Sequence, residues 1–171
     1  MAQWASAYTE SALGFSKTAG DLIGPCMFAI TMGISRVIFG KYGDRLDLMK
    51  FMAGSGFLCL LCYLTASISA NPVLGLVGCI LCGFSVGIMW PGTISICSRQ
   101  LPAGGTAMFA LLAMAGDLGG AFGPGLVGAV TQRTNDSLKT GMLMGSVFPL
   151  ILILSLFLLS RLRKSNAKTA T

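Results

Sequence analysis

Five long apolar stretches, separated by short charged loops, constrain this chain more than any other feature. They cover residues 19–40, 51–70, 72–97, 106–131 and 140–160. At about 1.5 Å per helical residue, each is long enough to cross a hydrocarbon layer of about 30 Å. Only three charged residues lie inside them, and a bilayer requires this because a charge at mid-depth costs at least about 2.5 kcal/mol. The sequence therefore predicts an all-α membrane protein with about five transmembrane helices.

The composition excludes other classes of protein. Charged residues make up 11% of the 171-residue chain and hydrophobic residues 54%, whereas a soluble domain carries about 25% charged residues. This hydrophobicity excludes a disordered chain, and it argues against nucleic-acid binding in spite of the net charge of +6. The chain has no histidine, the commonest metal ligand and catalytic base, and we expect neither a metal nor a cofactor.

The loop charges predict the orientation. Cytoplasmic loops carry the excess of Lys and Arg, and eight of these residues fall at one end of the expected bundle against three at the other. We therefore expect a multi-pass protein of the cell membrane, in contact with the bilayer, with residues 161–171 as a basic cytoplasmic tail. The richer end holds Lys41, Arg45, Lys50, Arg99, Arg161, Arg163, Lys164 and Lys168; the poorer end holds Lys17, Arg133 and Lys139.

Residues 1–16 are not a signal peptide, because they have neither a basic start nor an apolar centre. Residues 1–8 are instead typical of the last turns of a helix. We expect residues 1–16 to be the end of a truncated transmembrane helix and an outer loop, ahead of a five-helix bundle in residues 17–160.

An internal repeat supports a sixth helix. The tetrapeptide Ala-Gly-Asp-Leu occurs at residues 19–22 and at residues 115–118, each time followed by Gly-Pro. If residues 1–8 end a first helix, the copies lie in the second and fifth helices, which run in opposite directions, as in an inverted repeat. Because the match is only four residues long, coincidence is the alternative.

Small residues and prolines recur inside the apolar stretches. Small residues that recur every four positions let helices approach closely. Prolines remove a backbone hydrogen bond and favour kinks. Such helices suit a protein that changes shape, although static packing is the alternative. The first stripe is Gly75, Cys79, Gly83, Gly87 and Pro91, the second is Gly116, Gly120, Pro124 and Gly128, and the prolines are Pro25, Pro91, Pro124 and Pro149.

The loop after residue 40 resembles the signature loop of the major facilitator superfamily, G-x-x-x-D-R-x-G-R-K, which joins the second and third helices of each six-helix half. In this comparison Gly43 matches the second Gly of the motif, Lys41 its first basic residue and Arg45 its last. Gly40 stands in place of the Asp, Arg36 in place of the first Gly, and Asp44 in place of a basic residue.

The resemblance extends over the whole chain, which is similar to the C-terminal six-helix half of such a transporter. Gly119, Gly123, Pro124 and Gly128 resemble its Gly-Pro-rich helix, and residues 1–4 and 90–92 look most like bacterial sugar permeases. In this superfamily the solute site lies at mid-membrane between two halves. The resemblance therefore implies a solute, a coupling proton and a separate N-terminal half as partners.

Three charged residues inside the apolar stretches are candidates for proton coupling or substrate binding. Asp117 lies near the middle of residues 106–131, where a carboxylate must be paired, protonated or facing water; a structural hydrogen bond or ion pair is the alternative. Asp21 lies two residues inside the outer end of residues 19–40, and an acid in the first turn of a helix is also favoured by the helix dipole. Arg36, near the cytoplasmic end, could extend to the interface or pair with an acid across the two halves.

Four further candidates are placed on the cavity by the resemblance. Gln3, Trp4 and Glu10 belong to the expected first helix and its end, and Trp90 belongs to the other cavity-lining helix. Tryptophan can stack on a sugar, but it is also common at membrane interfaces.

The cysteines have the spacing of a zinc ribbon, with Cys59-x-x-Cys62 and Cys79-x-x-Cys82 separated by 16 residues. Both pairs lie in apolar stretches, where the thiolate is disfavoured. We therefore expect free thiols there, and also at Cys26 and Cys97.

We expect the chain to be part of a secondary transporter, a proton symporter working by alternating access, and not an enzyme. One alternative is a fragment that is inert alone and assembles with a separate N-terminal half. A membrane-embedded enzyme is a further alternative, but no phosphate-binding loop, nucleophile elbow or zinc-protease motif is present.

Overall fold

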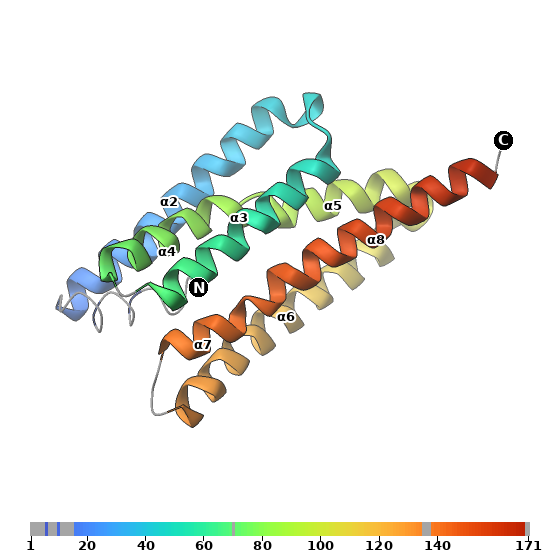
Figure 1. Cartoon of the computed structure of the whole chain (residues 1–171). Coiled ribbons are helices and arrows are strands. Elements are labelled where there is room, and N and C mark those ends of the chain that lie inside the picture. Colours follow the sequence, from blue (N-terminus) through green and yellow to red (C-terminus); the bar gives the residue numbers. More distant parts are fainter. Residues whose placement is uncertain (1–5, 7–9, 11–15, 70, 135–137, 170–171) are drawn as a thin grey trace.

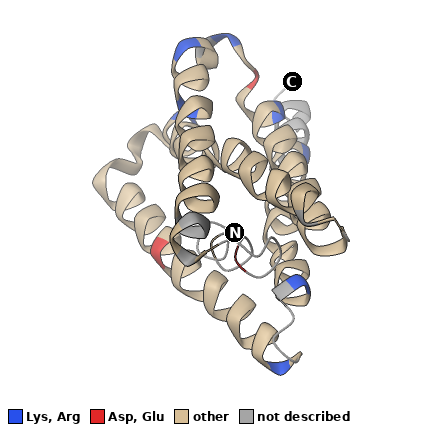
Figure 2. Cartoon of the chain, turned by 90° about the vertical axis from the view of Figure 1, so that its left-hand side faces the viewer, with Lys and Arg blue, Asp and Glu red and all other residues tan. Residues whose placement is uncertain are grey.

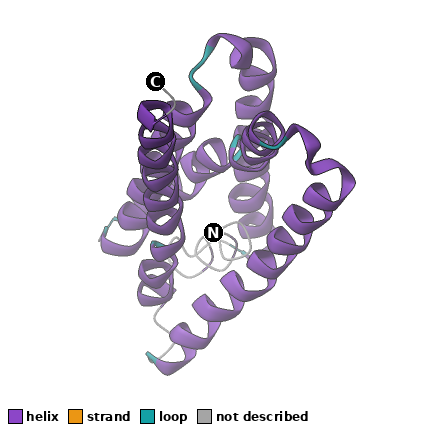
Figure 3. Cartoon of the chain, turned by 90° about the vertical axis from the view of Figure 1, so that its right-hand side faces the viewer, coloured by secondary structure: helices purple, strands orange, loops and turns teal. Residues whose placement is uncertain are grey.

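The computed structural model describes residues 6, 10, 16–69, 71–134 and 138–169. Helices make up almost all of this part of the chain, and no strand occurs in it (Figure 3). The elements are α2 (Lys17–Tyr42), η1 (Gly43–Arg45), α3 (Leu48–Ile68), α4 (Pro72–Val86), α5 (Met89–Gln100), η2 (Pro102–Gly104), α6 (Gly105–Arg133), α7 (Leu138–Gly145) and α8 (Val147–Thr169).

The five expected spans are confirmed. Segments long and apolar enough to cross a membrane run over Leu22–Tyr42, Leu48–Ile68, Val73–Gln100, Pro102–Arg133 and Lys139–Arg161. Lys and Arg gather toward the ends of the helices and leave long stretches of ribbon uncharged (Figure 2). Helix α8 continues to Thr169, so the expected cytoplasmic tail extends the last span as a helix.

Two of the five spans are broken near a proline. Residues Gly87 and Ile88 form a turn between α4 and α5, and Ser146 separates α7 from α8. Pro91 and Pro149 follow these breaks, so the predicted kinks are confirmed there. Helices α2 and α6, by contrast, continue through Pro25 and Pro124 as single helices.

Side-chain caps begin the helices that follow the short loops. The Asp47 carboxylate accepts a hydrogen bond of 3.4 Å from the backbone N–H of Lys50 at the start of α3. Asn71 accepts one of 2.9 Å from the N–H of Val73 at the start of α4, where Pro72 occupies the first turn. Such caps satisfy amides that have no carbonyl partner within the helix.

The helices alternate in direction along the chain (Figure 1). The α2–α3 and α5–α6 connections and the end of α8 lie toward one end of the bundle, and the α3–α4 and α6–α7 connections lie toward the other. Helix α4 packs against both α2 and α3, and α3 also contacts α7 and α8. Helix α3 is thus the centre of the bundle, while α6 contacts mainly α7.

The first small-residue stripe packs as expected. A Cβ added to Gly83 would collide with the backbone of Phe28, and one added to Gly87 would lie 2.8 Å from the carbonyl oxygen of Met32. Both partners are on α2, so these glycines let α2 and α4 approach backbone to backbone.

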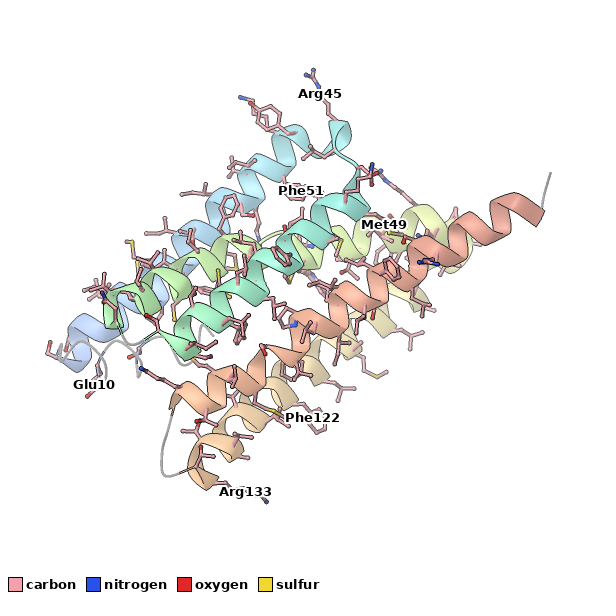
Figure 4. The ribbon with its side chains drawn as sticks, in the orientation of Figure 1. Glu10, Arg45, Met49, Phe51, Phe122 and Arg133 are labelled. Carbon is pink, nitrogen blue, oxygen red and sulfur yellow. The ribbon has the colours of Figure 1, made fainter. Side chains whose placement is uncertain are left out.

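The second stripe does not pack in this way within the described chain, and that expectation is wrong there. A Cβ on Gly120 would meet no atom within 4 Å, and Gly116 meets only one side chain, described below. Only 6% of the apolar window of α6 is buried, against 44% for the α4–α5 span. Phe122, 71% exposed, projects away from the other helices (Figure 4).

Candidate functional site

Asp117 lies near the middle of α6, and its side chain is exposed. No hydrogen bond or ion pair to Asp117 occurs within the part of the chain that the structure describes. A carboxylate at this depth is costly against lipid, because its charge loses hydration. Either the carboxyl group is protonated, or the exposed face of α6 has to meet water or another protein surface around Asp117.

Trp90 lies beside the same turn of α6. It is the second residue of α5 and is 43% exposed. A Cβ added to Gly116 would lie 2.9 Å from Cζ3 of the indole, so the ring rests directly on the Gly116 backbone. The structure therefore places one predicted candidate, Trp90, beside the α6 turn that carries another, Asp117.

Gly116 itself was not a predicted site residue, because it looked like one member of a packing stripe. The signal that distinguishes it is its position directly before Asp117 in the repeated Ala-Gly-Asp-Leu. Only a residue without a side chain leaves room there for the indole of Trp90.

Arg36 binds a backbone carbonyl within the described chain. Its Nε donates a hydrogen bond of 3.3 Å to the backbone carbonyl of Gly87, 51 residues further along the chain. No carboxylate lies within 4.0 Å of its guanidinium in the described ranges. Arg36 thus binds the turn between α4 and α5.

The remaining candidates lie apart from this group. Asp21 is inside α2, whose first turn contains no acidic residue, so the expected first-turn position is wrong. Glu10 is exposed and lies near the start of α2, at the opposite end from Arg45 (Figure 4). Gln3 and Trp4 lie outside the described residues.

The loop after α2 is a compact turn. Lys41 places its Nζ 5.6 Å from the centre of the Tyr42 ring, Gly43 begins the short helix η1, and Arg45 is exposed. A Cβ on Gly43 would lie 2.9 Å from the ring of Phe39, a side chain that can move.

The signature motif also fits this loop in another register. When the pattern starts at Gly40, its first Gly, its Asp and its Arg fall on Gly40, Asp44 and Arg45 without a substitution. Asp47 then stands in place of the second Gly. This register keeps the acidic residue of the motif, but Leu48 and Met49 stand in place of its last two basic residues.

Asp47 is the acidic residue of this loop whose side-chain contacts the structure describes. Its carboxylate forms an ion pair of 3.2 Å with Lys50. Hydrogen bonds from the Lys50 side chain and backbone hold the pKa of Asp47 below its ordinary value. A cavity of about 410 Å³ lies beside Asp47 and is also lined by Arg99 and Gln100 of α5.

No disulfide joins the cysteines among the described residues, and four of them are buried between α3 and α4. The sulfur atoms of Cys59 and Cys82 are 3.8 Å apart. Both border an apolar cavity of about 300 Å³, together with Tyr63 and Phe148. Among the described residues, no three His, Cys, Asp or Glu side chains are grouped so as to hold a metal ion.

Comparison with known proteins identifies one family. A family model described as Major Facilitator Superfamily matches residues 1–124, which include Trp90, Asp117 and the loop after α2. Neither a curated protein nor a solved structure matches the chain.

Proposed function

Because the chain belongs to the major facilitator superfamily, we propose that it moves a small organic solute, such as a sugar, across the cell membrane by proton-coupled alternating access. Members of this superfamily are multi-pass membrane transporters of small solutes and not enzymes. The proposal adds to this the solute class, symport with a proton, and a cytoplasmic C-terminus.

The observation that carries the proposal is the position of Asp117. A carboxyl group exposed at the middle of a span can take up and release a proton when water reaches it from either side. The indole of Trp90 contacts Gly116, the residue directly before Asp117. From this position the indole could stack on a solute ring. In this proposal Asp117 carries the coupling proton and Trp90 contacts the solute.

A test of coupling uses membrane vesicles that contain the chain and a pH-sensitive dye. Added sugars should acidify the interior when Asp117 is present, and Asp117→Asn should abolish that acidification. Asp47→Asn is the matched control, because it removes a carboxylate from the loop outside the spans. Proton entry that persists in Asp117→Asn at the wild-type rate would show that Asp117 does not couple transport.

The second candidate function is assembly with a separate six-helix half. It is favoured by the exposed face of α6, because only 6% of the most apolar part of this span is buried. On this proposal the chain transports nothing alone, and acidification appears only in vesicles that also contain an N-terminal half. Acidification by the purified chain alone would contradict it.

A further inference from the structure

The break between α4 and α5 leaves one backbone carbonyl without its usual donor. In a continuous helix the carbonyl of Gly87 would accept a hydrogen bond from the amide of residue 91, but residue 91 is proline, which has no N–H. The next carbonyl, that of Ile88, accepts a bond of 2.7 Å from the N–H of Gly92. The helical pattern therefore resumes immediately after Gly87.

Arg36 supplies the donor that Pro91 lacks. Its Nε reaches the Gly87 carbonyl at 3.3 Å from a different helix, α2. This approach depends on Gly87 having no side chain, because a Cβ there would lie 2.8 Å from both the Met32 carbonyl and the Cβ of Ser35. Ser35, next to Arg36, is buried in this contact.

The same bond gives the charge of Arg36 a partner inside a membrane span. No ion pair to Arg36 occurs within the described ranges, and a buried or membrane-embedded carbonyl without a donor also costs free energy. One hydrogen bond between α2 and the turn thus satisfies both the Nε–H of Arg36 and the carbonyl of Gly87.

The turn that Arg36 binds determines where α5 starts. Ile88, at this turn, is fully buried, and Trp90 follows it as the second residue of α5. The indole of Trp90 rests on Gly116 of α6, and α5 makes few other contacts with α6. A change in the bend would therefore move Trp90 away from the α6 turn that carries Asp117.

We propose that Arg36 is a positioning residue, which holds the bend between α4 and α5 through the Gly87 carbonyl and thereby seats Trp90 on Gly116. The importance of this seat for transport rests on the proposed function, but the seat itself does not. An optical measurement on Trp90 therefore tests the inference without any transport.

The experiment uses the full chain in lipid vesicles with Trp4→Phe, so that Trp90 is the only tryptophan. Four forms are compared: the parent, Arg36→Met, Pro91→Ala, and the double variant. The readouts are the emission maximum of Trp90 and its quenching by brominated lipids. Lys41→Met is the matched control, because it removes a cation from the same end of α2 without a bond to the turn.

In the parent, Arg36→Met should shift the emission of Trp90 and change its quenching, because the Gly87 carbonyl loses its donor. Pro91→Ala restores a backbone N–H for that carbonyl, so Arg36→Met should cause no further shift in the Pro91→Ala chain. Lys41→Met should leave the emission unchanged.

Equal shifts by Arg36→Met in the two backgrounds, or no shift in the parent, would overturn the inference. If Arg36→Met does not fold, its yield on size exclusion is the readout, and Pro91→Ala should restore that yield. A yield that Pro91→Ala leaves unrestored would also overturn it. Loss of transport in Asp117→Asn, or its persistence, has no bearing on these results, so the two proposals fail separately.

Discussion

The hydroxyl of Thr31 on α2 donates a hydrogen bond of 2.7 Å to the carbonyl of Ile80 on α4, 49 residues further along the chain. Gly83 lies about one turn after Ile80, and a Cβ there would lie 2.5 Å from the same hydroxyl. The two helices thus meet where one has a small polar side chain and the other has none.

Gly83→Leu should destabilise the chain more than loss of the hydrogen bond does. A leucine would force α2 and α4 apart, and overpacking of this kind typically costs about 1–3 kcal/mol. Thr31→Val should cost only about 0.6 kcal/mol, as is usual for hydrogen bonds between membrane helices. Unfolding in mixed micelles, followed by circular dichroism, measures both.

Gly33→Leu is the control for that series, because Gly33 lies on α2 with open space around its Cα. It should leave the free energy of unfolding unchanged. A loss of stability in Gly33→Leu as large as in Gly83→Leu would show that the contact between α2 and α4 is not what matters.

Cys59 and Cys82 should form a disulfide when the chain is treated with a membrane-permeant oxidant. Their sulfur atoms are 3.8 Å apart, so a short movement brings them to the bonding distance of about 2.05 Å. Each oxidised chain should then lose two maleimide-reactive thiols after denaturation, counted by mass spectrometry.

Cys82→Ala should prevent this loss, and Cys26→Ala should not, because Cys26 is an exposed residue of α2. An undiminished loss of two thiols in Cys82→Ala would mean that α3 and α4 do not meet at these residues.

The start of α3 should loosen in acid. Since the pKa of Asp47 is held below its ordinary value of 3.8, its stabilising effect is complete above that value and is lost as the pH falls through the lowered pKa. Asp47→Asn keeps a good cap but removes the ion pair with Lys50. We therefore compare the rate of amide hydrogen exchange at Lys50 in Asp47→Asn with the rate in the parent chain. The ratio of the two rates should approach one at low pH. A ratio that does not change with pH would contradict this prediction.

Gly141→Leu should release α6 from α7. A Cβ added to Gly141 would collide with the hydroxyl of Thr131 and would lie 2.9 Å from the carbonyl oxygen of Val127. Trypsin should then cleave faster after Arg133, the exposed last residue of α6. Gly125→Leu, on an open part of α6, should leave the rate unchanged, and equal acceleration by both would refute the role of this contact.

The parts of the fold that could be predicted depend on local properties. The length and hydropathy of a stretch decide whether it spans a bilayer, and the missing amide of Pro91 or Pro149 acts within its own helix. Both the five spans and the two breaks followed from these properties. The continuous course of α2 through Pro25 shows that a proline favours a break without always producing one.

The partners of the site residues could not be predicted, because they are set by packing between distant segments. The partner of Arg36 is a backbone carbonyl, which has no signature in a sequence of side chains. The stripes containing Gly83 and Gly120 have the same spacing, yet Gly83 meets the backbone of another helix whereas Gly120 meets no atom within 4 Å. The spacing of small residues shows that another helix can approach closely, but it does not show which helix does so.

The exposed carboxylate of α6 also bears on how the chain enters the membrane. Of the five spans, Pro102–Arg133 has the lowest hydropathy and the following span, Lys139–Arg161, has the highest. An aspartate near the centre adds about 2.5–3.5 kcal/mol to the cost of insertion. We expect α6 to remain at the translocon until α7 and α8 have been synthesised, and to enter the lipid with them as a helical hairpin that packs together at Gly141.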